Sequence, residues 1–188
     1  MNYRLFHEGI DLDLDSSNPL IASPSFPLVR DVEFIKLMNL CFLRADTFSM
    51  TRARWDMTTD LSLENELKPF FIRAFETSNW FCYRVPESSP IEVRLYRADE
   101  KSEKIILKYF REPFLSRCIG ENEWVYGTQT LEDLCFFSEG RLFYGTVTHE
   151  KLCYVFPKDK VFENYLKSSC YWIPTKDAGI GQIDLSQC

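Results

Sequence analysis

The stretch CFFSEGRLFYGTVTHEKLCYVFP, residues 135–157, constrains the fold more than any other part of this chain. Three apolar, aromatic segments are separated by two short polar pairs, Glu139-Gly140 and His149-Glu150. Apolar runs of this length that are interrupted by two-residue turn signals are typical of antiparallel strands joined by tight hairpins. The stretch therefore predicts a three-stranded β-meander.

The register of this meander follows if both polar pairs are two-residue turns. Phe136, Phe143 and Phe156 then form one cross-strand row. Four more side chains are expected on the face of that row: Leu134, Val147, Leu152 and Tyr154. Gly145 would lie between Leu134 and Tyr154, where the missing side chain leaves room for the tyrosine ring. In the alternative, Gly140 takes the left-handed position of a three-residue turn, and the pairing shifts by one residue.

Four further segments are expected to add strands. Residues 10–15 alternate aliphatic and aspartate side chains, as a half-buried strand does. WFCYRV (80–85) and IEVRLYR (91–97) are separated by a turn-rich PESSP, which predicts a hairpin between them. KIILKYF (104–110) is interpreted as another strand, and the alternative is a short helix capped by Ser102.

Helical periodicity is found on both sides of these strands. Asp31 is placed to cap an apolar helix that follows it. Residues 55–78 predict a second helix that either starts or kinks at Pro69, and residues 158–169 predict an amphipathic third. We expect a single globular domain over 1–188 of the α+β class: a mainly antiparallel sheet of about six strands, with two or three helices packed on it.

The overall charge and the lengths of the apolar runs limit the functions that this chain can have. The chain has 188 residues and a net charge of −6, which disfavours nucleic acid or an anionic membrane as its main partner. No apolar run approaches the roughly 20 residues that span a bilayer. The start lacks a signal-peptide core, and the seven cysteines are scattered and odd in number. These features predict a cytoplasmic protein with reduced thiols.

The sequence lacks the familiar motifs for catalysis, cofactor binding and metal binding. Neither histidine belongs to the HExxH zinc motif, and phosphate-binding glycine loops and serine-hydrolase elbows are missing. A looser zinc site could combine Cys135, Cys153 and His149. In the expected register, however, Cys135 faces Tyr144, Cys153 faces Thr146, and the histidine lies at the far turn. The sequence therefore predicts no catalytic residue, no cofactor and no metal site.

The distribution of charged residues along the sequence is the remaining indication of function. Two acidic stretches supply the candidate partner-binding residues, which are Trp55, Asp56, Asp60, Glu64 and Glu66 in one stretch and Asp11, Asp13 and Asp15 in the other. Residues 94–117 are mildly basic instead. Acidic surfaces with aromatic anchors suit a basic protein partner.

These observations predict a non-catalytic protein-binding module. An immunity or antitoxin-type inhibitor that neutralises a basic toxin or nuclease would fit the size and the acidity. The alternative is a small enzyme or a ligand-binding regulatory protein whose site is formed by residues far apart in the sequence. The sequence does not predict the oligomeric state.

Overall fold

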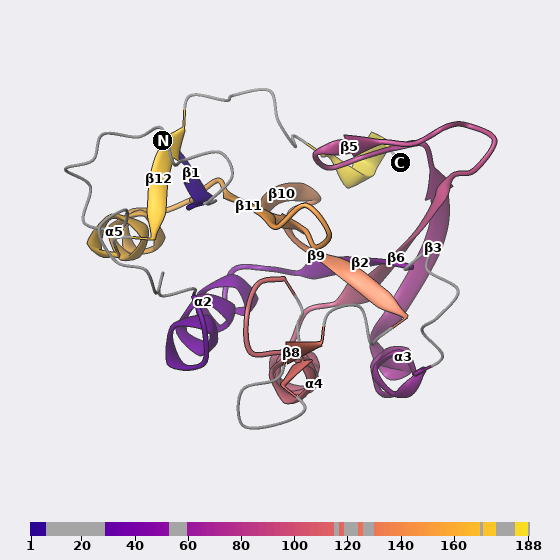
Figure 1. Ribbon diagram of the computed structural model, residues 1–188, viewed down its shortest axis with the longest axis horizontal. Helices are drawn as coiled ribbons and strands as arrows, with labels where there is room; N and C mark the ends of the chain where they lie inside the picture. Colours follow the sequence, from indigo (N-terminus) through magenta and orange to yellow (C-terminus); the bar gives the residue numbers. More distant parts are fainter. Residues whose placement is uncertain are drawn as a thin grey trace.

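The computed structural model describes residues 1–6, 29–52, 60–114, 117–118, 124–125, 130–169, 171–175 and 183–187. At its centre these residues form one eight-stranded sheet, in the order β12-β1-β11-β10-β9-β2-β6-β3, and every neighbouring pair is antiparallel (Figure 1). Its strands are β1 (Asn2–Leu5), β2 (Thr47–Arg52), β3 (Phe71–Thr77), β6 (Ile91–Arg97), β9 (Leu131–Ser138), β10 (Arg141–Val147), β11 (Leu152–Val155) and β12 (Trp172–Thr175). The predicted α+β class is confirmed, with more strands than the six expected. The predicted strand over residues 10–15 lies outside the described residues.

Four α-helices occur among the described residues: α2 (Val32–Phe42), α3 (Ser62–Leu67), α4 (Glu100–Tyr109) and α5 (Lys160–Ser168). Figure 1 shows α2, α3 and α4 on one side of the sheet, where their apolar side chains close the larger core. α5 joins this side through Phe162, whose ring packs edge-on against Phe143. Of the described helices, none has the length and hydropathy to cross a membrane.

Residues 104–109 form the second half of α4 and Phe110 is its C-cap. The strand that we predicted there is therefore wrong and the helical alternative is correct, although Asp99 rather than Ser102 is the N-cap. Asp99 is the N-cap, and its carboxylate accepts hydrogen bonds from the backbone N–H groups of Lys101 and Ser102. The Ser102 hydroxyl accepts in turn from the Asp99 N–H. This reciprocal capping box satisfies N–H groups that a strand would leave to a neighbour, and it stabilises the helix start.

Pro69 ends a helix rather than starting or kinking one. α3 stops at Leu67, and a single 3-10 turn (Lys68–Phe70) leads directly into β3. β3 occupies the sheet edge and pairs with β6, so the hairpin expected between residues 80–85 and 91–97 is also wrong. Residues 79–84 instead form a small separate hairpin of β4 (Asn79–Trp80) and β5 (Tyr83–Arg84).

The meander is present, and one of its two predicted registers is correct. β10 and β11 pair as expected, with Thr146 opposite Cys153. Glu139 and Gly140 both have positive φ, 52° and 75°, and form the predicted two-residue turn. Beyond that turn the β9–β10 register shifts between Leu142 and Tyr144, so Cys135 faces Gly145 and not Tyr144.

This bulge divides the row of side chains that the sequence placed on one face. Phe136, Phe143 and Leu134 lie in the helix-side core, whereas Val147 and Tyr154 belong to a second apolar cluster, and Leu152 and Phe156 pack against that cluster.

The second cluster lies on the other face of the sheet, under the β4–β5 hairpin and the chain's last turn, η2 (Leu185–Gln187) (Figure 1). The Phe81 ring can pack on this face because residue 145 is a glycine. A Cβ at this position would lie 2.7–2.9 Å from three ring atoms of Phe81, so the missing side chain makes room for this ring and not, as we expected, for that of Tyr154. The Phe81 and Tyr154 rings meet edge to face at 6.1 Å.

Candidate functional site

Five of the eight predicted partner-binding residues lie outside the described part of the chain: Asp11, Asp13, Asp15, Trp55 and Asp56. The other three are Asp60, Glu64 and Glu66, at or inside α3. Asp60 lies two residues before that helix, and its Oδ1 accepts from the backbone N–H of Ser62 at 2.9 Å.

Glu64 lies in a closed ring of ion pairs between α3 and the sheet. Its Oε1 lies 2.9 Å from Arg52 Nη2 and 2.7 Å from Arg94 Nη1. Glu92 completes the ring, with contacts of 3.3 Å to Arg52 Nε and 2.5 Å to Arg94 Nε. Thr130 adds a hydroxyl that donates to Glu64 Oε2. Two arginines and two glutamates thus compensate one another within the chain.

Glu66 is paired in the same way. Its Oε1 accepts from Lys108 Nζ at 2.5 Å and from the Tyr109 hydroxyl at 2.7 Å. The hydrogen bond from Lys108, followed by that from Tyr109, lowers the pKa of the Glu66 carboxyl. The acidic stretch 55–67 and the basic stretch 94–117 are therefore joined by Glu64–Arg94 and Glu66–Lys108 pairs, which reduces the charge that either offers to a partner.

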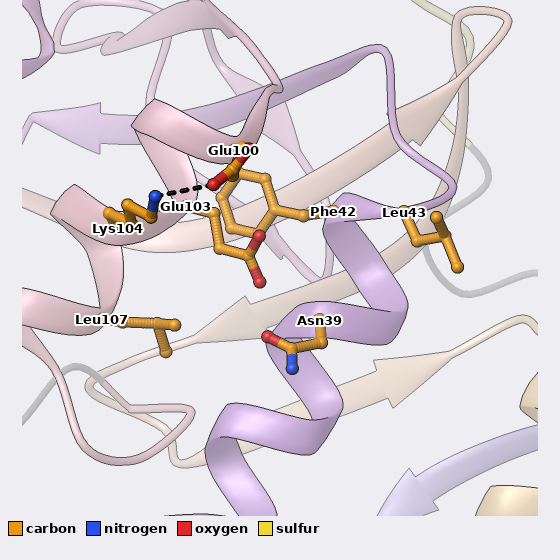
Figure 2. A pocket seen from close by; sticks show the side chains of 7 residues that line it. All are labelled: Asn39, Phe42, Leu43, Glu100, Glu103, Lys104 and Leu107. Carbon is orange, nitrogen blue, oxygen red and sulfur yellow. Dashed lines mark hydrogen bonds and ion pairs between the residues drawn. The ribbon is translucent and has the colours of Figure 1, made fainter.

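An open groove lies between α2 and α4. It has a volume of about 660 Å³ and is lined by Asn39, Phe42, Leu43, Glu100, Glu103, Lys104 and Leu107 (Figure 2). Leu43, which follows the last residue of α2, is 80% exposed, while Phe42 beside it is 7% exposed. Leu43 therefore places an apolar side chain in solvent at a groove that also holds charged groups.

The two carboxylates of the groove differ in their surroundings. Glu100 pairs with Lys104 at 2.6 Å, one helical turn away. Glu103 forms no ion pair with any described residue, although the Asn39 amide, oriented with its nitrogen towards the carboxylate, donates to Oε1 at 2.5 Å. Burial, and then the charge of Glu100, raises the pKa of Glu103. A cation that approached Glu103 would offset both effects.

The described free cysteines do not form a nucleophilic or zinc site. Cys153 belongs to the helix-side core and Cys135 to the cluster on the opposite face, so the looser zinc site from Cys135, Cys153 and His149 does not assemble. Burial raises the pKa of both thiols, and that of Cys82 to about 12. A thiol with a raised pKa is a poor nucleophile at neutral pH.

A cluster of possible metal ligands that the sequence did not predict lies where the start of β9 meets the turn between β10 and β11. Ligating atoms of Glu132, Asp133 and His149 lie within 4.8 Å of one another. Asp133 is fully buried with a φ of 55°, at the place where the β2–β9 register shifts. Burial, and then the charge of Asp133, raises the pKa of Glu132 to about 7. The signal in the sequence was an acidic pair that interrupts an otherwise apolar strand.

Comparisons with known proteins add no functional assignment to this geometry. No protein-family model matches the chain, and no similar protein was found among curated sequences or among solved structures.

Proposed function

We propose that this chain is a protein-binding module, and that the α2–α4 groove receives a short apolar and basic segment of its partner. The observation that carries the proposal is that the exposed side chain of Leu43 and the half-buried carboxylate of Glu103 line the same groove. One offers an apolar contact and the other offers a charge for a basic residue of the partner.

The apolar contribution comes from Leu43 together with the parts of Phe42 and Leu107 that line the groove. Burying the exposed Leu43 side chain under a partner would release water from its surface, at roughly 25 cal/mol for each Å² covered. Protein interfaces obtain most of their affinity from a few buried side chains whose neighbours exclude water. In Figure 2, Asn39, Glu100 and Lys104 supply polar groups around the groove.

The charge of the lining favours a basic segment over an acidic one. Two glutamates and one lysine line the groove, and Lys104 already pairs with Glu100. Glu103 is left as the carboxylate to which an arginine or lysine of the partner could bind. The chain's net charge of −6 adds a long-range attraction in the same direction.

Two helical peptides that share one leucine stripe would test this proposal. One carries arginine at its remaining exposed positions and the other carries glutamate. We expect the full chain to bind the arginine peptide more tightly, and added salt to weaken that binding because screening shortens the range of the attraction. Fluorescence anisotropy of the labelled peptides measures both affinities.

Matched variants locate the binding surface. Leu43→Lys removes the anchor and repels a basic peptide, so affinity should fall roughly tenfold or more. Val161→Lys is the control, because Val161 is 66% exposed on α5 and does not line the groove. Equal affinity in Leu43→Lys and Val161→Lys, or a preference for the glutamate peptide, would contradict the proposal.

Neutralisation of a basic toxin or nuclease is a special form of this function. It requires that the chain block the partner's activity when the two are mixed in equal amounts. For such a partner, Leu43→Lys should restore activity and Val161→Lys should leave it blocked. A partner that binds the groove and stays active would leave the binding function standing and exclude the inhibitory form.

A further inference from the structure

We propose that Glu132, Asp133 and His149 form a binding site for one divalent transition metal ion. Glu132 and Asp133 are the second and third residues of β9, and His149 lies in the turn between β10 and β11. Sheet pairing brings these distant residues together, so that their ligating atoms lie within 4.8 Å of one another. Ligands at about 2.1 Å from one tetrahedrally coordinated ion lie about 3.4 Å apart. The side chains would therefore have to approach one another by up to about 1.4 Å to complete the site.

The Asp133 carboxylate is already held in place by residues outside the cluster. Thr51 Oγ1 donates to its Oδ2 at 2.9 Å, and the Thr148 backbone N–H donates to its Oδ1 at 2.7 Å. Thr148 is anchored reciprocally, because its hydroxyl accepts from the Asp133 N–H. Partners that orient a ligand in this way are a regular feature of protein metal sites.

The placement of charge favours a cation. Asp133 is fully buried and Glu132 is partly buried directly beside it. Glu132 takes part in no hydrogen bond or ion pair between its side chain and another described residue. Two neighbouring carboxylates removed from water repel each other, and a bound divalent ion would offset both charges. His149 is exposed, so an ion can reach the cluster from solvent.

The donor atoms indicate the class of metal. Two carboxylate oxygens and one imidazole nitrogen suit Mn²⁺, Fe²⁺ or Zn²⁺. Ca²⁺ takes six to eight oxygen ligands, which this cluster does not supply. Three protein ligands also leave a coordination position for water, as in open zinc centres.

The site is separate from the α2–α4 groove. The side chain of Thr51 points to the face opposite those of Met50 and Arg52, because side chains alternate along β2. Met50 belongs to the helix-side core, and Arg52 reaches α3 through Glu64. The metal ligands therefore gather beside Thr51, on the face that the β4–β5 hairpin covers. Metal binding does not depend on the function proposed above.

Direct titration of the chelator-treated full chain with Mn²⁺ tests this proposal. Electron paramagnetic resonance reports the fraction of Mn²⁺ that is free, and Mn²⁺ prefers oxygen and nitrogen donors, so the chain's thiols interfere little. We expect one Mn²⁺ per chain. His149→Ala and Glu132→Gln should each weaken binding roughly tenfold or more. Asp133 is left unchanged, because it is buried and supports the local backbone.

Two control variants separate this site from general binding. His7→Ala removes the other histidine of the chain, and Glu87→Gln removes an exposed carboxylate from the 85–90 turn. Both should bind Mn²⁺ as the wild type does. Circular dichroism checks that each variant is folded. Wild-type affinity in His149→Ala and Glu132→Gln, or no binding at millimolar Mn²⁺, would overturn the proposal.

Discussion

The two faces of the central sheet are covered in different ways. Helices cover one face, where aromatic rings from α2, β2, β9 and β10 make mutual contacts, and charged residues pair at its margin. One short hairpin and the last turn of the chain cover the other face. There, Phe81 lies on Gly145 and Trp80 contacts Phe137.

The two faces of the sheet are therefore expected to differ in how easily they open locally. The helix-covered face is held by several elements at once, so the loss of one contact leaves the others in place. The hairpin-covered face has the smaller cluster of buried residues, so we expect local opening there to break fewer contacts. The buried carboxylate of Asp133 and its neighbours lie at this second face. A binding site suits a region that can adjust locally while the rest of the sheet stays rigid.

The largest change in the free energy of unfolding is expected from substitutions of two adjacent residues of β9. Phe136 and Phe137 are both fully buried, but they face opposite sides of the sheet. Phe136 contacts four rings at 4.8–6.3 Å, whereas Phe137 contacts that of Trp80 at 6.1 Å. Phe136→Ala should lower the free energy of unfolding by roughly 4–5 kcal/mol, and Phe137→Ala by roughly 3 kcal/mol. Urea denaturation measures both.

Hydrogen exchange adds a local readout to this comparison. Phe137→Ala should speed amide exchange in the β4–β5 hairpin more than in α2 and α4, because the hairpin loses its contact with the sheet. Phe136→Ala should speed exchange throughout. If both variants gave the same exchange pattern, the two faces would not differ in the way described.

The next effect concerns the close approach of Phe81 to Gly145. A Cβ on residue 145 would meet the ring at 2.7–2.9 Å, so Gly145→Ala should cost roughly 2 kcal/mol of stability through overpacking. With Phe81→Ala already in place, the same substitution should be neutral or slightly stabilising, because alanine is the better strand residue. A double-mutant cycle measures this coupling. Equal costs in both backgrounds would show that the hairpin does not rest on Gly145.

The meander shows how far the fold could be predicted from sequence. Alternation and turn residues were sufficient for its three strands and for the β10–β11 register. The β9–β10 register could not be predicted, because a bulge at Leu142/Tyr144 depends on packing from both sides of the sheet. KIILKYF is short and apolar, and periodicity alone does not distinguish a buried helix from a strand in such a segment. The segment is helical, and the Asp99–Ser102 capping box stabilises the start of that helix.

The candidate sites were harder to predict than the fold. The charge of Glu64 and Glu66 was visible in the sequence, but their partners Arg94 and Lys108 lie 30 and 42 residues away. Glu132 and Asp133 were overlooked because His149 joins them through sheet pairing alone. The groove lined by Leu43 and Leu107 depends on how α2 and α4 pack, which no local pattern specifies.

A smaller effect is expected at the margin of the helix-covered face. Glu64→Gln removes the central carboxylate of the ion-pair ring while Glu92 still pairs with both arginines. Since Arg52 is 36% exposed, the cost should be about 1 kcal/mol and should shrink as salt is added. Thermal unfolding at low and high ionic strength measures it. A cost that does not change with salt would point to packing rather than charge.

The smallest effect concerns Asp159, the N-cap of α5, on the same face. Its hydrogen bond from Arg44, the first of several causes, lowers the pKa of the Asp159 carboxyl to about 2. A carboxyl with a lower pKa in the folded than in the unfolded chain stabilises the fold above its unfolded pKa, and this stabilisation is lost as the pH falls through about 2. Asp159→Asn keeps a capping oxygen and removes the charge. Because Asp159 is 42% exposed, the loss at about pH 6 should be only a few tenths of a kcal/mol.

Denaturant unfolding at several pH values follows this difference between the wild type and Asp159→Asn. The two curves should converge below about pH 2, because the wild-type carboxyl is then protonated as well. The same substitution should leave hydrogen exchange in the β4–β5 hairpin unchanged, since Arg44 and Asp159 do not belong to the hairpin-covered face. A gap that persisted at low pH would mean that the asparagine disturbs the cap itself. Faster exchange in the hairpin would mean that the two faces are coupled through the sheet.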